Sequence, residues 1–211
     1  RSAFHKRGAV MIAVVDYGVG NLFPLVCSLG KIGAESKVVT TADELKKADK
    51  IILPGVGAFA DAAEKLRLSG MRQTVLEMAG GGTPLLGICL GMQLLFDKSL
   101  EYGEHRGLGL VSGVVDEIKG LPSGFKVPHM GWNALRFKKP CPIYKYIKNG
   151  DYVYFVHSYH GTLCGKSVTA TADYGVPVTA SVMEGNVFGT QFHPEKSGET
   201  GLKILTAFAE L

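Results

Sequence analysis

The chain has 211 residues, of which 46% are hydrophobic and 20% are charged, and its formal net charge at pH 7 is +4. This length and composition suit one globular domain with a large core. The small, dispersed charge argues against nucleic-acid binding, and no apolar run approaches the roughly 20 residues that span a bilayer, so we expect neither a nucleic acid nor a membrane as partner.

Four cysteines, Cys27, Cys89, Cys141 and Cys164, show neither a CxxC pair nor the spacing of a zinc site. We therefore expect reduced thiols, a cytoplasmic location, and neither a metal nor another cofactor. Residues 1–10 lack the apolar segment of a secretory signal and precede a plausible start at Met11. We interpret residues 1–10 as an expression remnant or a disordered tail, and residues 11–211 as one domain.

The first half of the chain alternates predicted strands and helices. We expect strands at residues 11–15, 36–39, 51–53 and 85–88. We expect helices at residues 21–32, 58–68 and 71–79, and Thr41 with Glu44 indicates a capping box before a further short helix. This alternation predicts an α/β fold with a mostly parallel sheet flanked by helices, and ligands beyond the carboxyl ends of its strands.

The second half has short predicted strands without long helices between them. These strands are expected at residues 110–119, 132–137, 152–158, 168–172, 179–183 and 187–192. They predict antiparallel or mixed sheet added to the same domain, and residues 201–211 predict a closing amphipathic helix.

Residues 87–93 read Gly-Ile-Cys-Leu-Gly-Met-Gln, with Cys89 at the centre. An apolar run leads into the cysteine and a helical pattern over residues 90–96 follows it, so we expect Cys89 on a sharp turn between a buried strand and a helix. The spacing Gly-x-Cys-x-Gly is that of the Gly-x-Ser-x-Gly nucleophile elbow. Free N–H groups at the start of the helix would favour the thiolate, which is the nucleophilic form. A buried structural cysteine is the alternative.

A nucleophilic cysteine needs a base, and His193 is the candidate. Pro194 follows it and disfavours both strand and helix, so the chain must leave the predicted strand at His193. Glu195 emerges on the same turn and can orient the imidazole. Taken singly, His193 could be a solvated histidine and Glu195 a surface charge. Together with Cys89 they predict a catalytic triad.

The stretches 87–93 and 191–197 resemble the two halves of the catalytic site of class I (triad) glutamine amidotransferases. Three further stretches resemble the glutaminase subunits of imidazole glycerol-phosphate synthases: Asp16-Tyr17-Gly18-Val19-Gly20-Asn21, Pro128-His129-Met130-Gly131-Trp132-Asn133 and Phe155-Val156-His157-Ser158-Tyr159. Met92 is typical of this subgroup, whereas many relatives in other pathways carry His there. The resemblance runs from Met11 to the carboxyl terminus and implies a flavodoxin-like fold.

The resemblance implies that Cys89 attacks the side-chain amide of glutamine and that His193 protonates the leaving nitrogen, which gives ammonia and a thioester. The tetrahedral intermediate needs N–H donors, and the elbow geometry offers that of Leu90. The resemblance places the second donor, Val56 or Gly57, in the loop Pro54–Gly57, and implies that this loop can sit flipped until partner and ligand bind. An ordinary loop is the alternative reading.

Substrate-binding residues are also implied by the resemblance. They are Gly57, Gln93, which could instead be a solvated helix residue, and the backbone of Ser158 and Tyr159.

No second domain or nucleotide loop is present to use the ammonia, so the product must pass to another chain. The resemblance implies a (β/α)8-barrel cyclase subunit, which makes imidazole glycerol phosphate and aminoimidazole carboxamide ribotide in histidine biosynthesis. It offers four interface residues: Asn21, Trp132, Tyr154 and Lys196. Trp132 could instead lie in the core, Tyr154 could pack the sheet, and the other two could be plain surface.

Three rival functions stay open at this point. The first is a class I amidotransferase subunit of another pathway, such as aminobenzoate, purine or pyrimidine synthesis. The second is a stand-alone cysteine peptidase or γ-glutamyl hydrolase. The third is a non-catalytic binding module on the same fold.

Overall fold

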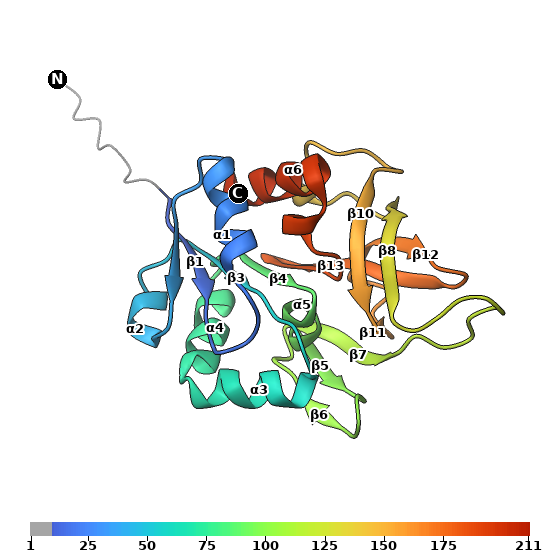
Figure 1. Ribbon diagram of the computed structural model, residues 1–211. Coiled ribbons are helices and arrows are strands. Elements are labelled where there is room, and N and C mark those ends of the chain that lie inside the picture. Colours follow the sequence, from blue (N-terminus) through green and yellow to red (C-terminus); the bar gives the residue numbers. More distant parts are fainter. Residues whose placement is uncertain (1–9) are drawn as a thin grey trace.

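An eight-stranded sheet forms the centre of the computed structural model, which describes residues 10–211 (Figure 1). The strand order is β2-β1-β3-β4-β14-β13-β12-β9, with the first five strands parallel and the last three antiparallel. The parallel strands are β2 (Ser36–Val39), β1 (Ile12–Val15), β3 (Lys50–Leu53), β4 (Leu85–Ile88) and β14 (Val187–Thr190). The antiparallel strands are β13 (Pro177–Glu184), β12 (Val168–Asp173) and β9 (Arg136–Phe137).

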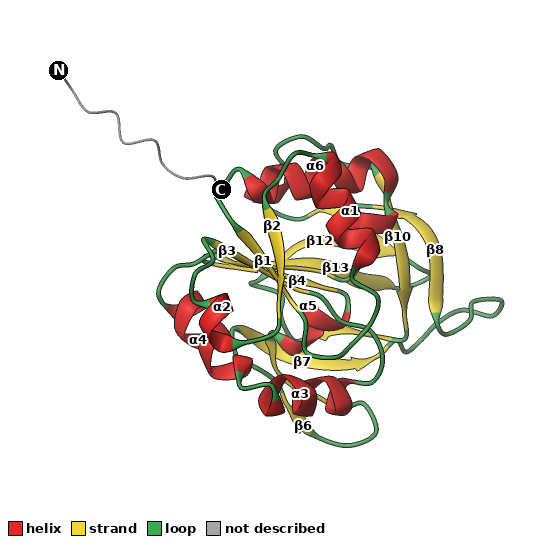
Figure 2. Cartoon of the chain, turned by 60° about the vertical axis from the view of Figure 1, so that its left-hand side comes forward, coloured by secondary structure: helices red, strands yellow, loops and turns green. Residues whose placement is uncertain are grey.

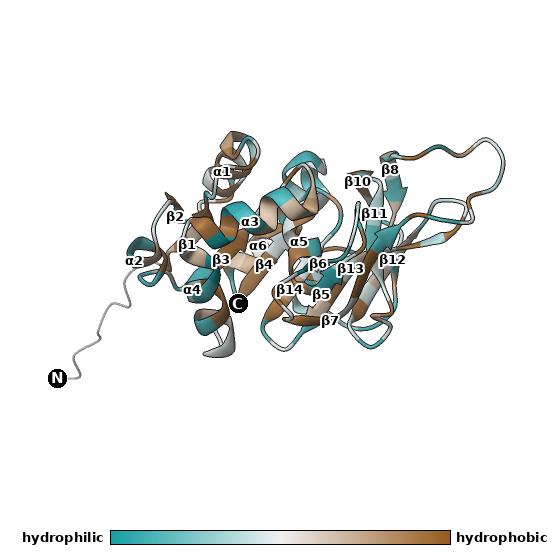
Figure 3. Cartoon of the chain, turned by 90° about the horizontal axis from the view of Figure 1, so that it is seen from below, coloured by the Kyte–Doolittle hydropathy of each residue, from teal (hydrophilic) through white to brown (hydrophobic). Residues whose placement is uncertain are grey.

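Helices cover both faces of this sheet (Figure 2). Helices α1 (Phe23–Lys31) and α6 (Gly198–Ala209) lie on one face, and α2 (Ala42–Leu45), α3 (Phe59–Leu68) and α4 (Met71–Gly80) lie on the other. The residues of β1 are therefore buried on both sides and alternate between two apolar clusters. Figure 3 shows this as hydrophobic colour along β1 and hydrophilic colour on the outer helix α2.

Two smaller sheets extend the domain at the side of β13. One has the order β11 (Tyr159–Thr162), β7 (Val111–Glu117), β5 (Phe96–Ser99) and β6 (His105–Arg106). The other pairs β10 (Tyr152–His157) with β8 (His129–Ala134). The short helix α5 (Leu90–Leu94) and the 3₁₀ turns at Pro142–Tyr144 and Pro194–Lys196 complete the elements.

The predicted fold class, a mostly parallel sheet flanked by helices with added antiparallel strands, is confirmed. The predicted cap at Thr41 is present in a modified form. Thr41 Oγ1 accepts a hydrogen bond from the Glu44 N–H at 3.3 Å, while the Glu44 carboxylate accepts from the N–H of Thr40 rather than that of Thr41. Helix α6 begins three residues earlier than predicted, at Gly198, and strand β14 ends two residues earlier, at Thr190.

Two sequence predictions around the added strands were wrong. The helical pattern after Cys89 ends at Leu94, because Phe96 begins β5 and its ring packs against Gly161 of β11. The expected single strand over residues 132–137 is divided into β8 and β9, which pair with different strands on either side of the buried Leu135. Strands β5, β6 and β11 were not predicted, since their pairing partners are distant in the chain.

The expectation for residues 1–10 falls, apart from Val10, outside the described residues. None of the helices within residues 10–211 has the length and apolar character that crossing a membrane requires.

A substitution at Gly91 of α5 tests how closely this helix packs against the sheet. A methyl group at this position would overlap the carbonyl oxygen of Leu53 at the end of β3. We predict that Gly91→Ala lowers the free energy of unfolding by at least about 3 kcal/mol, because backbone must move to admit it. Gly80→Ala is the matched control, since Gly80 is also helical but has open space at its Cα; we expect it to be neutral or stabilising by up to about 1 kcal/mol. Urea unfolding of both variants measures the difference, and a Gly91→Ala protein as stable as the wild type would contradict this packing.

Candidate active site

Cys89 lies on the turn between β4 and α5 with its backbone in an unusual conformation. Its φ is +55°, a value that side chains other than glycine rarely adopt, and its N–H donates to the carbonyl of Thr190 on β14 at 2.7 Å. Gly87 and Gly91 make the turn possible, because a methyl group on Gly87 would lie 2.7 Å from the Gly91 carbonyl oxygen. This is the predicted elbow, with the cysteine at the carboxyl end of a central strand.

His193 and Glu195 follow β14, the strand beside β4. His193 Nδ1 donates to a carboxylate oxygen of Glu195 at 2.7 Å, and both side chains are at least nine-tenths buried. The backbone of His193 is held on both sides: its N–H donates to the Tyr154 carbonyl at 3.0 Å, and its carbonyl accepts from the Ser197 hydroxyl at 2.6 Å. The imidazole is therefore fixed in orientation, with its Nε2 left without a hydrogen-bond partner in the protein.

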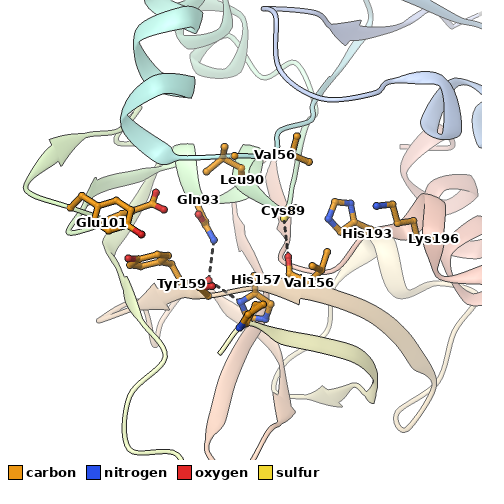
Figure 4. Close-up of a pocket in the computed structure, with 14 residues that line it drawn as sticks. Val56, Cys89, Leu90, Gln93, Glu101, Val156, His157, Tyr159, His193 and Lys196 are labelled. Carbon is orange, nitrogen blue, oxygen red and sulfur yellow. Dashed lines mark hydrogen bonds between the residues drawn. The ribbon is translucent and has the colours of Figure 1, made fainter. Parts of the chain in front are cut away.

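The electrostatics of His193 favour the imidazolium. Burial by itself lowers the pKa of the imidazole, but interactions with Cys89 and with the Glu195 carboxylate outweigh it and raise the pKa to about 9. The imidazole is thus protonated at neutral pH and lies beside the thiol (Figure 4).

A cavity of about 380 Å³ opens onto the thiol and the imidazole (Figure 4). Its lining brings together nine residues that the sequence singled out: Val56, Gly57, Cys89, Leu90, Gln93, Ser158, Tyr159, His193 and Lys196. Glu195 lies behind His193 rather than in this cavity. No group of three His, Cys, Asp or Glu side chains in the described part of the chain is arranged to hold a metal ion.

Gln93 is buried, so it is not the solvated helix residue that the sequence left open. Its amide nitrogen donates to the Tyr159 carbonyl at 3.0 Å and to the side-chain oxygen of Gln191 at 3.1 Å. The side-chain nitrogen of Gln191 in turn lies 3.8 Å from Cys89 Sγ. Gln93 is thus held at the cavity wall in a network that reaches the sulfur.

The N–H of Leu90 is occupied in this structure. It donates to the carbonyl oxygen of Gly55 at 3.3 Å, so the loop Pro54–Gly57 turns an acceptor toward the position where donors are needed. The same loop is fixed at its start by the Tyr17 hydroxyl, which donates to the Pro54 carbonyl at 2.8 Å. The oxyanion role expected of Val56 or Gly57 stays a prediction.

Three of the four interface candidates, Trp132, Tyr154 and Lys196, lie on adjoining segments, because β8 pairs with β10 and β10 is hydrogen-bonded to the turn at residues 193–197. Trp132 of β8 is 52% exposed, so it is not a core residue, and it contacts Tyr154, its cross-strand neighbour on β10, edge to face. Lys196 is exposed directly after Glu195, where it reaches the cavity. Asn21 is exposed before α1, and its side-chain oxygen accepts from the Phe23 N–H at 3.0 Å.

Sequence reasoning missed several residues of the cavity, above all Glu101. His157, which was expected to order the glutamine pocket or its rim, does line the cavity. Glu101 is buried after β5, with one carboxylate oxygen accepting from the Phe59 N–H at 2.6 Å. It is the only acidic side chain in the cavity lining of the described residues. No local motif marks Glu101, because it reaches the site through the unpredicted strand β5.

Comparison with known proteins agrees with this geometry. The family model "Glutamine amidotransferase class-I" matches residues 13–210. Among solved structures, PurLQS from Thermotoga maritima superposes with a TM-score of 0.75 at 22% identity, covering 96% of this chain and 99% of that one. A structure described as a glutamine amidotransferase gives a TM-score of 0.73 at 20% identity, over 94% and 99% of the two chains.

The chain therefore belongs to the class I glutamine amidotransferase family, as its sequence motifs indicated. Its similar relatives carry a more specific name, "Imidazole glycerol phosphate synthase subunit HisH". The protein of Caldanaerobacter subterraneus subsp. tengcongensis is 50% identical over 95% of this chain and 98% of its own length. That of Geobacillus sp. is also 50% identical, over 95% and 97%. The predicted resemblance to this subgroup is confirmed.

Glu195→Gln tests the role of the carboxylate. The amide keeps the shape of the side chain but not its charge, so we predict that the pKa of His193 falls from about 9. The imidazolium is then lost at a lower pH, and the alkaline limb of the kcat profile shifts to lower pH with a loss of activity on the order of 100-fold or more. NMR titration of His193 and the pH profile of glutamine hydrolysis measure the two effects. An unchanged His193 titration would show that Glu195 does not act on the imidazole.

Proposed function

We propose that the chain hydrolyses L-glutamine to glutamate and ammonia through a thioester on Cys89. The observation that carries this proposal is that Cys89 and His193, the latter hydrogen-bonded to Glu195, line the same cavity of about 380 Å³. Elsewhere in the same cavity lies Glu101, a carboxylate suited to the ammonium group of a free amino acid.

Each step uses a group that the site supplies. The Cys89 thiolate attacks the amide carbon, and the oxyanion that forms is stabilised by the N–H of Leu90 and that of Val56 or Gly57. His193 gives its proton to the nitrogen as the C–N bond breaks, so that ammonia leaves and the thioester remains. His193 then takes a proton from water, whose oxygen attacks the thioester, and glutamate and the thiol are released. Glu195 holds the imidazole in the required orientation.

Binding of the amino-acid part of glutamine follows from the same cavity. We assign Gln93 and Gly57 to the walls of the cavity. The backbone of Ser158 and Tyr159 would hold the amino-acid end of glutamine, and Glu101 would face its ammonium group. Because the Leu90 N–H donates to the Gly55 carbonyl, this carbonyl must first turn away before the N–H can face an oxyanion. We therefore infer low turnover for the isolated chain.

We propose that the ammonia passes to a cyclase subunit of (β/α)8-barrel fold, which forms imidazole glycerol phosphate in histidine biosynthesis in the cytoplasm. The relatives' name describes a subunit of that synthase. Exposed aromatic and apolar side chains offer a face for such a partner. They include Trp132 and Met130 of β8 and Phe23 of α1, which are 52%, 60% and 70% exposed. We assign three further contacts to this partner face: Asn21, Tyr154 and Lys196. Ammonia that crosses a covered interface avoids protonation in bulk water.

Glutamine hydrolysis with and without the partner tests this function. We predict slow release of glutamate by the chain alone and stimulation by at least about tenfold when the cyclase subunit and its ribulosyl-carboxamide nucleotide are added, because the loop Pro54–Gly57 must be rearranged. Cys89→Ala is the control and should abolish both rates without preventing association. Full hydrolysis of γ-glutamyl peptides by the chain alone would instead indicate a stand-alone hydrolase, and stimulation by a different synthase would indicate another pathway.

A further inference from the structure

A buried pair of histidines lies under the amino-acid end of the cavity and has no role in the mechanism above. His157, the last residue of β10, lines the cavity and is 6% exposed, and His129, its cross-strand neighbour on β8, is fully buried. Their rings face each other, with His129 Nδ1 and His157 Nε2 2.9 Å apart. The His129 ring is stacked between the rings of Tyr174 and Phe155, whose centroids are 4.0 and 4.7 Å away.

Both outer nitrogens of the pair face oxygen acceptors. His157 Nδ1 lies 2.8 Å from the Tyr159 carbonyl oxygen, which also accepts from Gln93 (Figure 4). His129 Nε2 lies 2.7 Å from the side-chain oxygen of Asn133. The amide nitrogen of Asn133 donates to the Asp173 carbonyl at 2.8 Å, which fixes the assignment of the amide oxygen toward His129.

The protons in this row of hydrogen bonds can be counted. The row has one contact between two ring nitrogens and, at its ends, two contacts from a ring nitrogen to an oxygen acceptor. Each contact needs one proton, which makes three, but two neutral imidazoles carry only two on their ring nitrogens. Whichever tautomers are chosen, a neutral pair leaves one contact of 2.7 to 2.9 Å between two lone pairs. Rotating the Asn133 amide does not help, because it places its oxygen against the Asp173 carbonyl. Only a pair with one additional proton, and hence one net positive charge, satisfies every contact.

The protein surroundings oppose that charge. Burial lowers the pKa of both imidazoles. Besides His129, the groups whose charge acts on His157 are His160 on β11 and His193 after β14, and a positive charge on either opposes a charge on His157. His129 is faced by the phenol ring of Tyr174 and the amide of Asn133, and neither histidine is hydrogen-bonded to a carboxylate. A neutral pair with one unsatisfied contact and a charged pair without a counter-ion are therefore both costly, and a negative charge close to the pair would favour the charged form.

Bound glutamine would supply this charge. Its α-carboxylate shares a carbon atom with the ammonium group that we assign to Glu101, so it must lie close to the wall formed by residues 157–159. Of the cationic candidates that line the cavity, Lys196 and His193 lie on the side of the cavity away from Glu101 (Figure 4). His157 is the remaining one, and it is next to Ser158 and Tyr159.

We propose that the His129–His157 pair takes up one proton from solvent when the α-carboxylate of glutamine binds, and that the resulting cation is part of the recognition of the free amino acid. The inference rests on the proposed function and adds His129, His157 and Asn133 to the residues that determine substrate specificity. The proton completes the hydrogen-bond chain, and its charge is balanced by the carboxylate. A ligand without that carboxylate leaves the pair neutral.

Calorimetric titration of L-glutamine into the Cys89→Ala chain, alone and with the cyclase subunit, tests the proposal. Titrations near pH 7 in buffers of different ionisation enthalpy give the number of protons taken up per glutamine bound. We expect an uptake approaching one proton, and a dissociation constant that rises with pH by up to about tenfold per unit. L-Glutaminol, in which an alcohol replaces the carboxylate, should bind without this uptake.

A second substitution identifies the group that gains the proton. Asn133→Asp places a carboxylate against His129, so the pair is already protonated, and proton uptake should fall toward zero while glutamine still binds. The second carboxylate oxygen replaces the donor to the Asp173 carbonyl, so thermal unfolding of the variant is measured alongside to show that it is folded. Asn149→Asp is the matched control: Asn149 is exposed and accepts a hydrogen bond only from the Phe137 N–H, so it should leave the uptake unchanged. Any proton taken up by His193 would be taken up by all of these proteins, so it cancels when their proton uptakes are compared.

The outcomes separate this inference from the proposed function. Saturable glutamine binding with no proton uptake, or the same uptake in Asn133→Asp, would overturn the inference and leave the glutaminase intact. Absence of both glutamine binding and glutamine hydrolysis in the presence of the partner would overturn the proposed function. In the active wild-type complex, the same linkage should make the KM for glutamine rise with pH. In the Asn133→Asp complex, the KM should depend less on pH.

Discussion

The backbone conformation of Cys89 is the constraint on which the site depends. A residue with φ of +55° is strained unless its surroundings hold it, and here β4, β14 and α5 do so. Gly91 lets α5 approach the end of β3 so closely that a single methyl group would overlap backbone. Because β14 is hydrogen-bonded beside β4, the residues that follow it are brought to the same end of the sheet, which is how His193 comes to lie beside a cysteine that is distant in the chain.

One hydrogen bond beside that turn sets the orientation of the loop Pro54–Gly57. The Leu90 N–H has a single proton to donate, and the Gly55 carbonyl accepts it. If this N–H stabilises the intermediate, as we propose, the Gly55 carbonyl must first turn away. An amidotransferase subunit benefits from such an arrangement, since ammonia released without the acceptor present is lost to solvent.

The sequence was most informative where local patterns determine the structure. Apolar runs located the central strands, the glycines around Cys89 indicated the elbow, and Pro194 indicated the turn that presents His193 and Glu195. It was least informative where distant segments pair. Phe96 looked helical because the Gly161 that receives its ring lies 65 positions further on, and Glu101 reaches the cavity only through the pairing of β5. The roles of individual residues, including the oxyanion donors and interface contacts, stay predictions.

Trapping of the covalent intermediate tests the central claim most directly. The complex with the cyclase subunit is mixed with L-glutamine, quenched in acid during turnover, digested and analysed by peptide mass spectrometry. We expect a γ-glutamyl thioester on the peptide that contains Cys89, and none on those with Cys27, Cys141 or Cys164. Sustained glutamine hydrolysis with no adduct on Cys89, or by a protein in which Cys89 is replaced by alanine, would contradict it.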